Sequence, residues 1–258
     1  MAHRSNRRRA RRRGRFSGLY KLLSALLILA ALVAGCLVFF RVDTVVVSGN
    51  QRYTQEEIIQ VSGVSQGENL FALLLRRGEI AQTLREQLPY VEAVSIRTAL
   101  PDTLIVEVRE CQAAAYITYE GADWLLNTSG KLLERVEQGQ TGDALEITGV
   151  TALQPSPGTP LAVSVEESRK LADLLALMQA LEERELLAGA DSIDLSSDSR
   201  MEMRYEDRLT VRFAYASDYS YDAKALQAAI DYLGPEERSV VDLTFEDGPH
   251  LYQEQGEG

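Results

Sequence analysis

The sequence predicts an α+β protein with one membrane-spanning helix near its N-terminus, followed by two small domains. Three observations predict this architecture. A single long apolar segment covers residues 22–40. Helices with capping signals and short strands rich in Val, Ile and Thr follow it. Charge is also separated along the chain, with nine cations and no acid in residues 1–21 and a net charge of −20 over the other 237 residues.

Residues 22–40 are expected to form a transmembrane helix. Twelve of these 19 residues are Leu, Ile, Val or Phe. A helix of that length spans about 28 Å, close to the ~30 Å hydrocarbon core of a bilayer. By the positive-inside bias, the arginine-rich residues 1–21 are expected to stay behind as a basic cytoplasmic tail. The rest of the chain, from Arg41, would then be extracytoplasmic.

The small residues ahead of Cys36 leave a second interpretation open, that of an exported lipoprotein whose mature chain begins at an acylated Cys36. The apolar leader would have an acceptable length. Cleavage would, however, leave Leu37, Val38, Phe39 and Phe40 where a lipoprotein normally has a polar tether. In an uncleaved anchor the same four residues complete the span, so the anchor is favoured.

The cysteines and histidines do not favour catalysis. The two cysteines are Cys36, inside the apolar segment, and Cys111, so no disulfide is expected in the exported part. The two histidines, His3 and His250, lie in the basic head and the C-terminal tail, so no His-based relay or metal cluster is expected. The stretch SGVSQGEN lacks the lysine of a phosphate-binding loop. We therefore predict a protein that is not an enzyme, with no catalytic residues, metal site or cofactor.

The residues after the apolar segment predict the order β-α-α-β-β. A β-branched strand over Val42–Ser48 ends at the turn residues SGN. Thr54 and Glu57 have the spacing of a capping box for the first helix. The second helix carries an apolar stripe four residues apart and ends before a proline, with Ile80, Leu84, Leu88 and Pro89. The turn LPD then separates two strands, Val91–Thr98 and Thr103–Arg109. A three-stranded sheet with both helices on one face is the compact way to bury these stripes.

Two stretches of this segment, VDTVVVSGNQRYTQEEIIQVSGVSQGENLFALL and LREQLPYVEAVSIRTALPDTLIVEVRE, resemble the POTRA domain of the bacterial cell-division family FtsQ/DivIB. The resemblance implies a POTRA domain over residues 41–110. The family usually continues with Glu-Arg-x-Pro, whereas Glu110 is followed here by Cys111, Gln112 and Ala113. This departure concerns the connection between the domains and leaves the domain assignment intact.

The resemblance continues to residue 247 and implies a strand-rich, FtsQ/DivIB-like C-terminal domain over residues 111–247. A capping box at Ser164 and Glu167 predicts a long helix there, and a second helix is expected over Asp222–Leu233. Strands are expected at Ala114–Thr118, Trp124–Asn127, Leu132–Val136, Ile193–Leu195, Met201–Tyr205, Leu209–Phe213 and Val240–Phe245. Residues Leu145–Gly149 resemble the family's short Leu-Pro-x-Ile-x-Gly element, with Glu146 at the Pro position. Residues 248–258, with Gly, Pro, Gln and Glu, are expected to be a disordered tail.

By this resemblance the protein is a divisome scaffold concentrated at the septum. It would bind partners of the FtsB/DivIC and FtsL type and help control septum formation and septal peptidoglycan synthesis. The partner surface is expected on the last strand, where an unpaired edge accepts a strand from a partner; its candidate residues are Val240, Val241, Asp242, Leu243, Thr244 and Phe245, with the neighbouring strand Leu209–Phe213. A competing interpretation is that Val241, Leu243 and Phe245 only fill the core.

No nucleic acid or small-molecule substrate is expected as a partner. One alternative function is that of a POTRA-type envelope assembly factor, since POTRA domains also receive unfolded clients. Such factors usually carry several POTRA copies and a long barrel of alternating strands, and neither is visible in the sequence.

Overall fold

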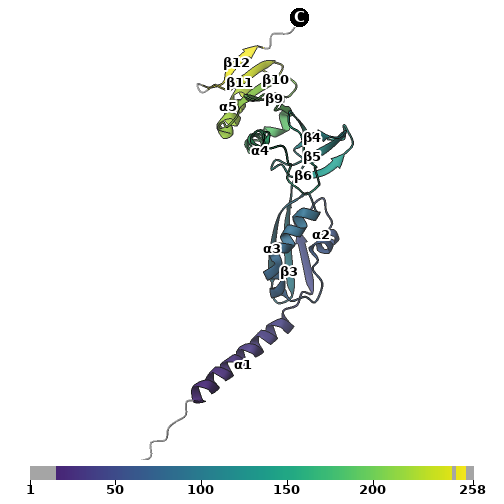
Figure 1. Cartoon of the computed structure of the whole chain (residues 1–258), viewed down its shortest axis with the longest axis vertical. Helices are drawn as coiled ribbons and strands as arrows, with labels where there is room; N and C mark the ends of the chain where they lie inside the picture. Colours follow the sequence, from purple (N-terminus) through teal and green to yellow (C-terminus); the bar gives the residue numbers. More distant parts are fainter. Residues whose placement is uncertain (1–15, 246–247, 254–258) are drawn as a thin grey trace, which may run out of the picture.

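The structure, a computed structural model, describes residues 16–245 and 248–253. Helix α1 (Phe16–Phe39) projects away from two stacked domains (Figure 1). Within the described residues it is the one helix long and apolar enough to cross a membrane, over the 22 residues Gly18–Phe39, and its apolar side chains are exposed. This fits the predicted span. Most of the predicted basic tail, residues 1–15, lies outside the described residues.

Helix α1 runs directly into the first domain. The side-chain amide of Asn69 donates hydrogen bonds to the carbonyl oxygens of Cys36 and Leu37, both at 3.2 Å. The backbone N–H of Leu70 donates to the carbonyl of Phe40 at 3.0 Å. The last turn of α1 is therefore held by the domain that follows it, and no linker separates the two.

The first domain has the predicted order β-α-α-β-β. Its elements are β1 (Thr44–Ser48), α2 (Gln55–Ser62), α3 (Leu70–Gln87), β2 (Val91–Ala99) and β3 (Thr103–Glu110). The three strands form one sheet in the order β1-β3-β2, with β1 parallel and β2 antiparallel to β3. The central strand β3 is thus the last in sequence, which ties both ends of the domain together.

Local sequence accounts for these elements. Thr54 and Glu57 form the predicted capping box at the start of α2, and Gly63 ends that helix in the left-handed conformation. The predicted stripe of α3 is buried, and it packs with alternate residues of β3 in one apolar core; the shared core includes Ile58, Leu73, Ile80, Leu84, Leu88, Leu104, Val106 and Val108.

The second domain is built on one nine-stranded sheet in the order β12-β11-β10-β9-β8-β7-β4-β5-β6. Its strands are β4 (Ala115–Tyr119), β5 (Ala122–Leu126), β6 (Leu132–Val136), β7 (Leu145–Thr148), β8 (Ala190–Asp194), β9 (Arg200–Tyr205), β10 (Leu209–Ala214), β11 (Ser239–Leu243) and β12 (His250–Gln253). Two helices, α4 (Ser168–Glu182) and α5 (Tyr219–Tyr232), and the short 3-10 helix η1 (Leu187–Gly189) complete it. Residues of α4 and α5 share one apolar core with the sheet.

The predicted capping box of the long helix caps a preceding turn instead. The hydroxyl of Ser164 accepts a hydrogen bond from the N–H of Glu167 at 3.2 Å, but α4 begins only at Ser168. Ser164 and Glu167 therefore form a capping hydrogen bond, but around the turn that precedes α4 and not at the start of the helix.

The expectation of a disordered tail over residues 248–258 is wrong for residues 250–253. These residues form β12, which pairs antiparallel with β11 from Ser239 opposite Gln253 to Asp242 opposite His250. The overall composition of the tail favours disorder, but the backbone of residues 250–253 pairs with an edge of β11 whose N–H and C=O groups would otherwise lack partners. Residues 254–258 lie outside the described residues.

Candidate partner interface

The structure places the six candidate partner residues on an interior strand and just beyond its end. Strand β11 lies between β10 and β12, so its backbone is paired on both sides. Val241 and Leu243 are buried in the core, as the competing interpretation holds, and Val240 is half-buried. The predicted neighbour β10 is interior as well, between β9 and β11. An unpaired edge at β11 is therefore a wrong expectation, because β12 pairs with β11 on its outer side.

The polar candidates interact with one another. Asp242 is buried, and its carboxylate accepts hydrogen bonds from the backbone N–H and the hydroxyl of Thr244 at 3.0 and 2.6 Å. The same carboxylate lies 3.8 Å from the guanidinium of Arg212 on β10. These contacts fix the end of β11. Phe245, which follows, is the one candidate with an exposed side chain.

Strand β12 is the free edge of the sheet among the described residues. The opposite edge strand, β6, contacts the first domain through Leu133, which packs with Tyr90, and through Glu134, which pairs with Arg52. Strand β12 lies at the far end of the molecule from α1 (Figure 1). Its Leu251 and Tyr252 side chains are exposed. A partner strand can add here by backbone pairing.

An apolar groove runs between β12 and α5. Tyr221 and Tyr232 of α5 line one side, and Pro249 and Leu251 line the other. Tyr232 is 81% exposed, unusual for a large aromatic residue in a folded domain. Exposed tyrosines over a floor of alanines provide the large, rigid contact area that dominates many protein interfaces. Leu251 lies on the α5 side of β12, whereas Tyr252, the next residue of the strand, lies on the opposite side, where the ring of His250 contacts those of Phe245 and Tyr252. We call Tyr221, Tyr232, Phe245, Leu251 and Tyr252, which flank the β12 edge from its two sides, the terminal face.

Sequence reasoning did not find the α5 part of this face. The signal was present, since Tyr221, Ala225, Ala228 and Tyr232 recur at i, i+4, i+7 and i+11, which is one side of a helix. His250 belongs to this region too, because its ring lies 4.5 Å from that of Phe245 and 6.3 Å from that of Tyr252. The prediction that His250 lies outside the folded part is therefore wrong.

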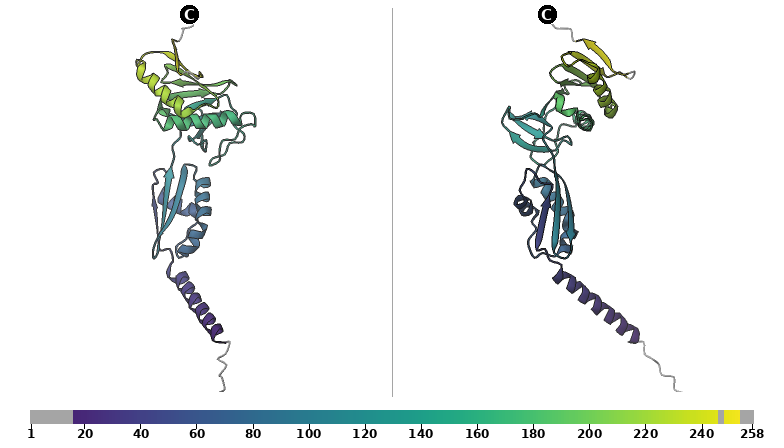
Figure 2. Two further views of the ribbon diagram at one scale, coloured as in Figure 1. Left: turned by 90° about the vertical axis from the view of Figure 1, so that its left-hand side faces the viewer. Right: turned by 180° about the vertical axis from the view of Figure 1, so that it is seen from behind.

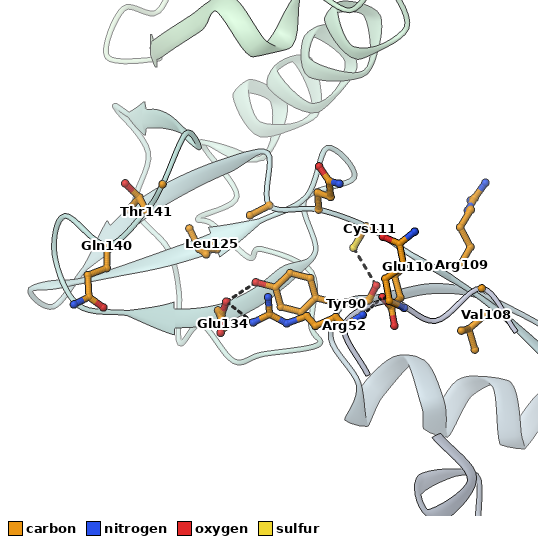
Figure 3. A pocket seen from close by; sticks show the side chains of 15 residues that line it. Arg52, Tyr90, Val108, Arg109, Glu110, Cys111, Leu125, Glu134, Gln140 and Thr141 are labelled. Atoms are coloured by element: carbon orange, nitrogen blue, oxygen red, sulfur yellow. Dashed lines mark hydrogen bonds and ion pairs between the residues drawn. The ribbon is translucent and has the colours of Figure 1, made fainter. Parts of the chain in front are cut away.

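A second concave site lies between the two domains (Figure 3). The guanidinium of Arg52 lies 3.8 Å from the ring centre of Tyr90 and 2.9 Å from the carboxylate of Glu134. The hydroxyl of Tyr90 donates to the same carboxylate. Burial, and then the hydrogen bond to Glu134, raise the pKa of Tyr90. The three side chains join the domains through a mixed aromatic and ionic contact.

Glu110 links two segments of the chain at this cleft. Its carboxylate accepts hydrogen bonds from the backbone N–H groups of Gln51 and Arg52 at 3.0 and 2.7 Å. Burial raises the pKa of the neighbouring Cys111 thiol, which disfavours the nucleophilic thiolate. Over residues 16–245 and 248–253, no group of three or more His, Cys, Asp or Glu side chains is arranged to hold a metal ion.

Over the described residues the fold defines a class of protein, one with an N-terminal apolar helix, a β-α-α-β-β domain and a larger domain built on one sheet. Residues 40–110 match the model of the POTRA domain, FtsQ-type. The chain is 29% identical over 160 residues to the cell division protein FtsQ of Syntrophotalea carbinolica, a match that covers 62% of this chain and about half, 54%, of that relative. It is 26% identical over 213 residues to the cell division protein DivIB of Clostridium acetobutylicum, covering 82% of each chain.

One solved structure, the major extracytoplasmic domain of the cell division protein DivIB from Geobacillus stearothermophilus, is also similar. It aligns with 48% of this chain and 98% of its own at 16% identity and a TM-score of 0.30. The resemblance to the FtsQ/DivIB family that the sequence indicates is confirmed by the POTRA match and by the names of these relatives.

Proposed function

We propose that this chain is a single-span scaffold of the bacterial division machinery. In this proposal the apolar part of α1, from residue 22 onward, crosses the plasma membrane, residues 1–21 stay in the cytoplasm, and both domains face outward at the septum. The cell-division names of the relatives support the division role. The apolar helix next to an arginine-rich segment supports the anchorage and its direction.

The proposed task of the second domain is to dock a division partner of the FtsB/DivIC and FtsL type at the terminal face, and so to help control septum formation and septal peptidoglycan synthesis. The observation that carries this proposal is the position of β12 as the terminal strand of the sheet among the described residues, beside the exposed Tyr232. A partner strand added to β12 gains backbone hydrogen bonds, and an adjoining apolar segment fills the groove along α5.

Five of the six residues first predicted for partner binding keep a role in this proposal. Val241 and Leu243 anchor β11 in the core, and Asp242 fixes its end through Thr244 and Arg212. The register of β11 in turn sets the register of β12. Phe245 contributes its exposed ring directly.

Site-specific photo-cross-linking in growing cells tests this proposal. A photoreactive residue replaces Tyr232 or Tyr252 in the full-length chain, and Thr118, an exposed residue of β4, provides the control position. We expect capture of an FtsB/DivIC- or FtsL-type protein, identified by mass spectrometry, from positions 232 and 252 and not from 118. Equal capture from all three positions, or capture only of proteins unrelated to division, contradicts the proposal.

The anchorage is tested separately by the intact mass of the membrane-extracted chain. An uncleaved anchor leaves α1 in the mature protein. A lipoprotein would instead lack residues 1–35 and carry the added mass of a lipid on Cys36. Detection of the lipidated species overturns the single-span proposal.

A further inference from the structure

We propose that the membrane-proximal end of the POTRA domain rests in the interface of the bilayer that α1 crosses, through the apolar side chains Phe71, Leu75 and Leu100. We call these three residues the POTRA base. The inference rests on the proposed membrane-spanning role of α1 and goes beyond it, because a spanning helix alone does not decide whether the domain touches lipid.

The junction between α1 and the domain forces the two to lie close together. Asn69, the residue that caps α3, hydrogen-bonds the carbonyls of Cys36 and Leu37 in the last turn of α1. The ring of Phe71 packs edge-on against that of Phe40, with the ring centres 5.3 Å apart. The start of α3 is therefore level with the end of the apolar helix, where the hydrocarbon core would end.

The turn between β2 and β3 lies at this same end. The backbone N–H groups of Asp43 and Thr44 donate to the carbonyl of Asp102 at 2.9 and 3.3 Å. Asp43 follows Phe40 by only three residues. Both views in Figure 2 show α1 meeting the first domain at the end opposite the second domain. Leu100, in this turn, is therefore close to the same plane as Phe71.

Apolar exposure in the first domain is concentrated at this end. Over residues 41–110, all of which the structure describes, the exposed large apolar side chains are Val46, Phe71, Leu75 and Leu100. Three of the four belong to the POTRA base. Leu75 is 89% exposed and Leu100 is 61% exposed. Water is a poor environment for such a cluster, and the membrane interface is a favourable one.

The expected depth of these residues agrees with the dimensions of a bilayer. The headgroup region adds about 5–7 Å on each side of the hydrocarbon core. Leu75 follows Phe71 by four residues, or about 6 Å along α3. Phe71 would thus lie at the core boundary and Leu75 within the headgroup region.

The charges nearby are mixed in sign. Arg76 pairs with Glu79 at 3.4 Å and with Glu68 at 4.0 Å, and the exposed Arg41 is close in sequence to Asp43. We therefore expect the insertion of apolar side chains, and not attraction to anionic lipid, to drive this contact. Membranes of zwitterionic phosphatidylcholine should suffice.

Tryptophan quenching by lipids with brominated acyl chains tests this inference on the full chain in phosphatidylcholine vesicles. The native chain contains one tryptophan, Trp124 in the second domain, which gives the background. The test variants are Leu75→Trp and Leu100→Trp. The matched control is Gln82→Trp, since Gln82 is exposed on the same side of α3 about 10 Å farther along it. Leu29→Trp, within α1, reports on the span itself.

We expect quenching of Leu75→Trp and Leu100→Trp to exceed that of Gln82→Trp by about twofold or more, because only the first two reach the bilayer. Equal, background-level quenching of all three, with strong quenching of Leu29→Trp, overturns the contact while leaving the span intact. Absence of quenching at Leu29→Trp contradicts the proposed anchorage, and with it the contact that rests on it.

Discussion

The ammonium group of Lys131, just ahead of β6, donates a 2.7 Å hydrogen bond to the backbone carbonyl of Arg85 in the last turn of α3. The same group donates to the carbonyl of Val91 at 3.0 Å. The last carbonyls of a helix have no partner within it, and a cation at that end also favours the helix dipole. A lysine of the second domain therefore completes a helix of the first and ties the two domains together.

Replacement of Lys131 should loosen this connection. Lys131→Met retains most of the apolar stem but leaves the part-buried carbonyl of Val91 and the exposed carbonyl of Arg85 without their donor, so we expect a loss of about 1–2 kcal/mol in the free energy of unfolding. Denaturant unfolding of the detergent-solubilised chain measures it. Lys224→Met, at an exposed lysine of α5, serves as the control and should change little. Equal stabilities for the two variants would remove Lys131 from this role.

Tyr90 should contribute more to the domain contact than the ion pair beside it. Its side chain is buried between the domains, so Tyr90→Ala should cost about 3–5 kcal/mol, whereas Tyr90→Phe, which loses only the hydroxyl bond to Glu134, should cost about 1 kcal/mol. Arg52 and Glu134 have side chains 51% and 38% exposed, and Arg52→Met should cost no more than about 1 kcal/mol. The same unfolding measurement ranks the three. If Arg52→Met lowers the free energy of unfolding more than Tyr90→Ala does, the ion pair contributes more to the domain contact than Tyr90, and the prediction is wrong.

Gly49 should be intolerant of any side chain. Its φ is +81°, and a Cβ there would lie 2.0 Å from the carbonyl oxygen of Val108 in β3. Gly63 also has a positive φ, +65°, but open space around it. Gly63→Ala should therefore cost only the strain of the left-handed conformation, about 1–2 kcal/mol. Gly49→Ala should cost clearly more, and a thermal unfolding series that ranks the two variants the other way would contradict the close approach.

Asp222 should make stability depend on pH. It is buried in the first turn of α5, its Oδ2 has no hydrogen-bond partner among the described residues, and burial raises its pKa. Because the folded pKa lies above the unfolded one, the folded state holds this proton more tightly. Burial of the charged carboxylate therefore lowers the free energy of unfolding. This loss is present in full above the folded pKa and disappears below the unfolded pKa, near 3.9.

Asp222→Asn tests this directly. The stability of the variant minus that of the native chain should increase as the pH rises from about 4 to 7, because only the native chain incurs the charge penalty. Unfolding free energies at both pH values give the comparison, and Asp231→Asn, at an exposed site on the same helix, is the matched control. If the difference in unfolding free energy between Asp222→Asn and the native chain stays constant with pH, the charge of Asp222 does not destabilise the fold.

The first domain was predictable because its signals are local. The capping box of Thr54 and Glu57 and the stripe Ile80, Leu84 and Leu88 each act within a few residues, and each occurs in the structure as expected. The second-domain box at Ser164 failed as a helix start, because a capping hydrogen bond forms equally well around an isolated turn. The capping hydrogen bond forms in both cases, and what differs is whether a helix or an isolated turn follows it.

The sequence by itself determined the apolar span, the charge separation and the β-α-α-β-β order, since each follows from composition or short-range periodicity. Only the tertiary structure decided that β12 covers β11 and that Tyr232 stands beside the open edge. Whether a strand lies inside a sheet or at its edge depends on which distant segment pairs with it, and that pairing leaves no mark on the strand's own residues.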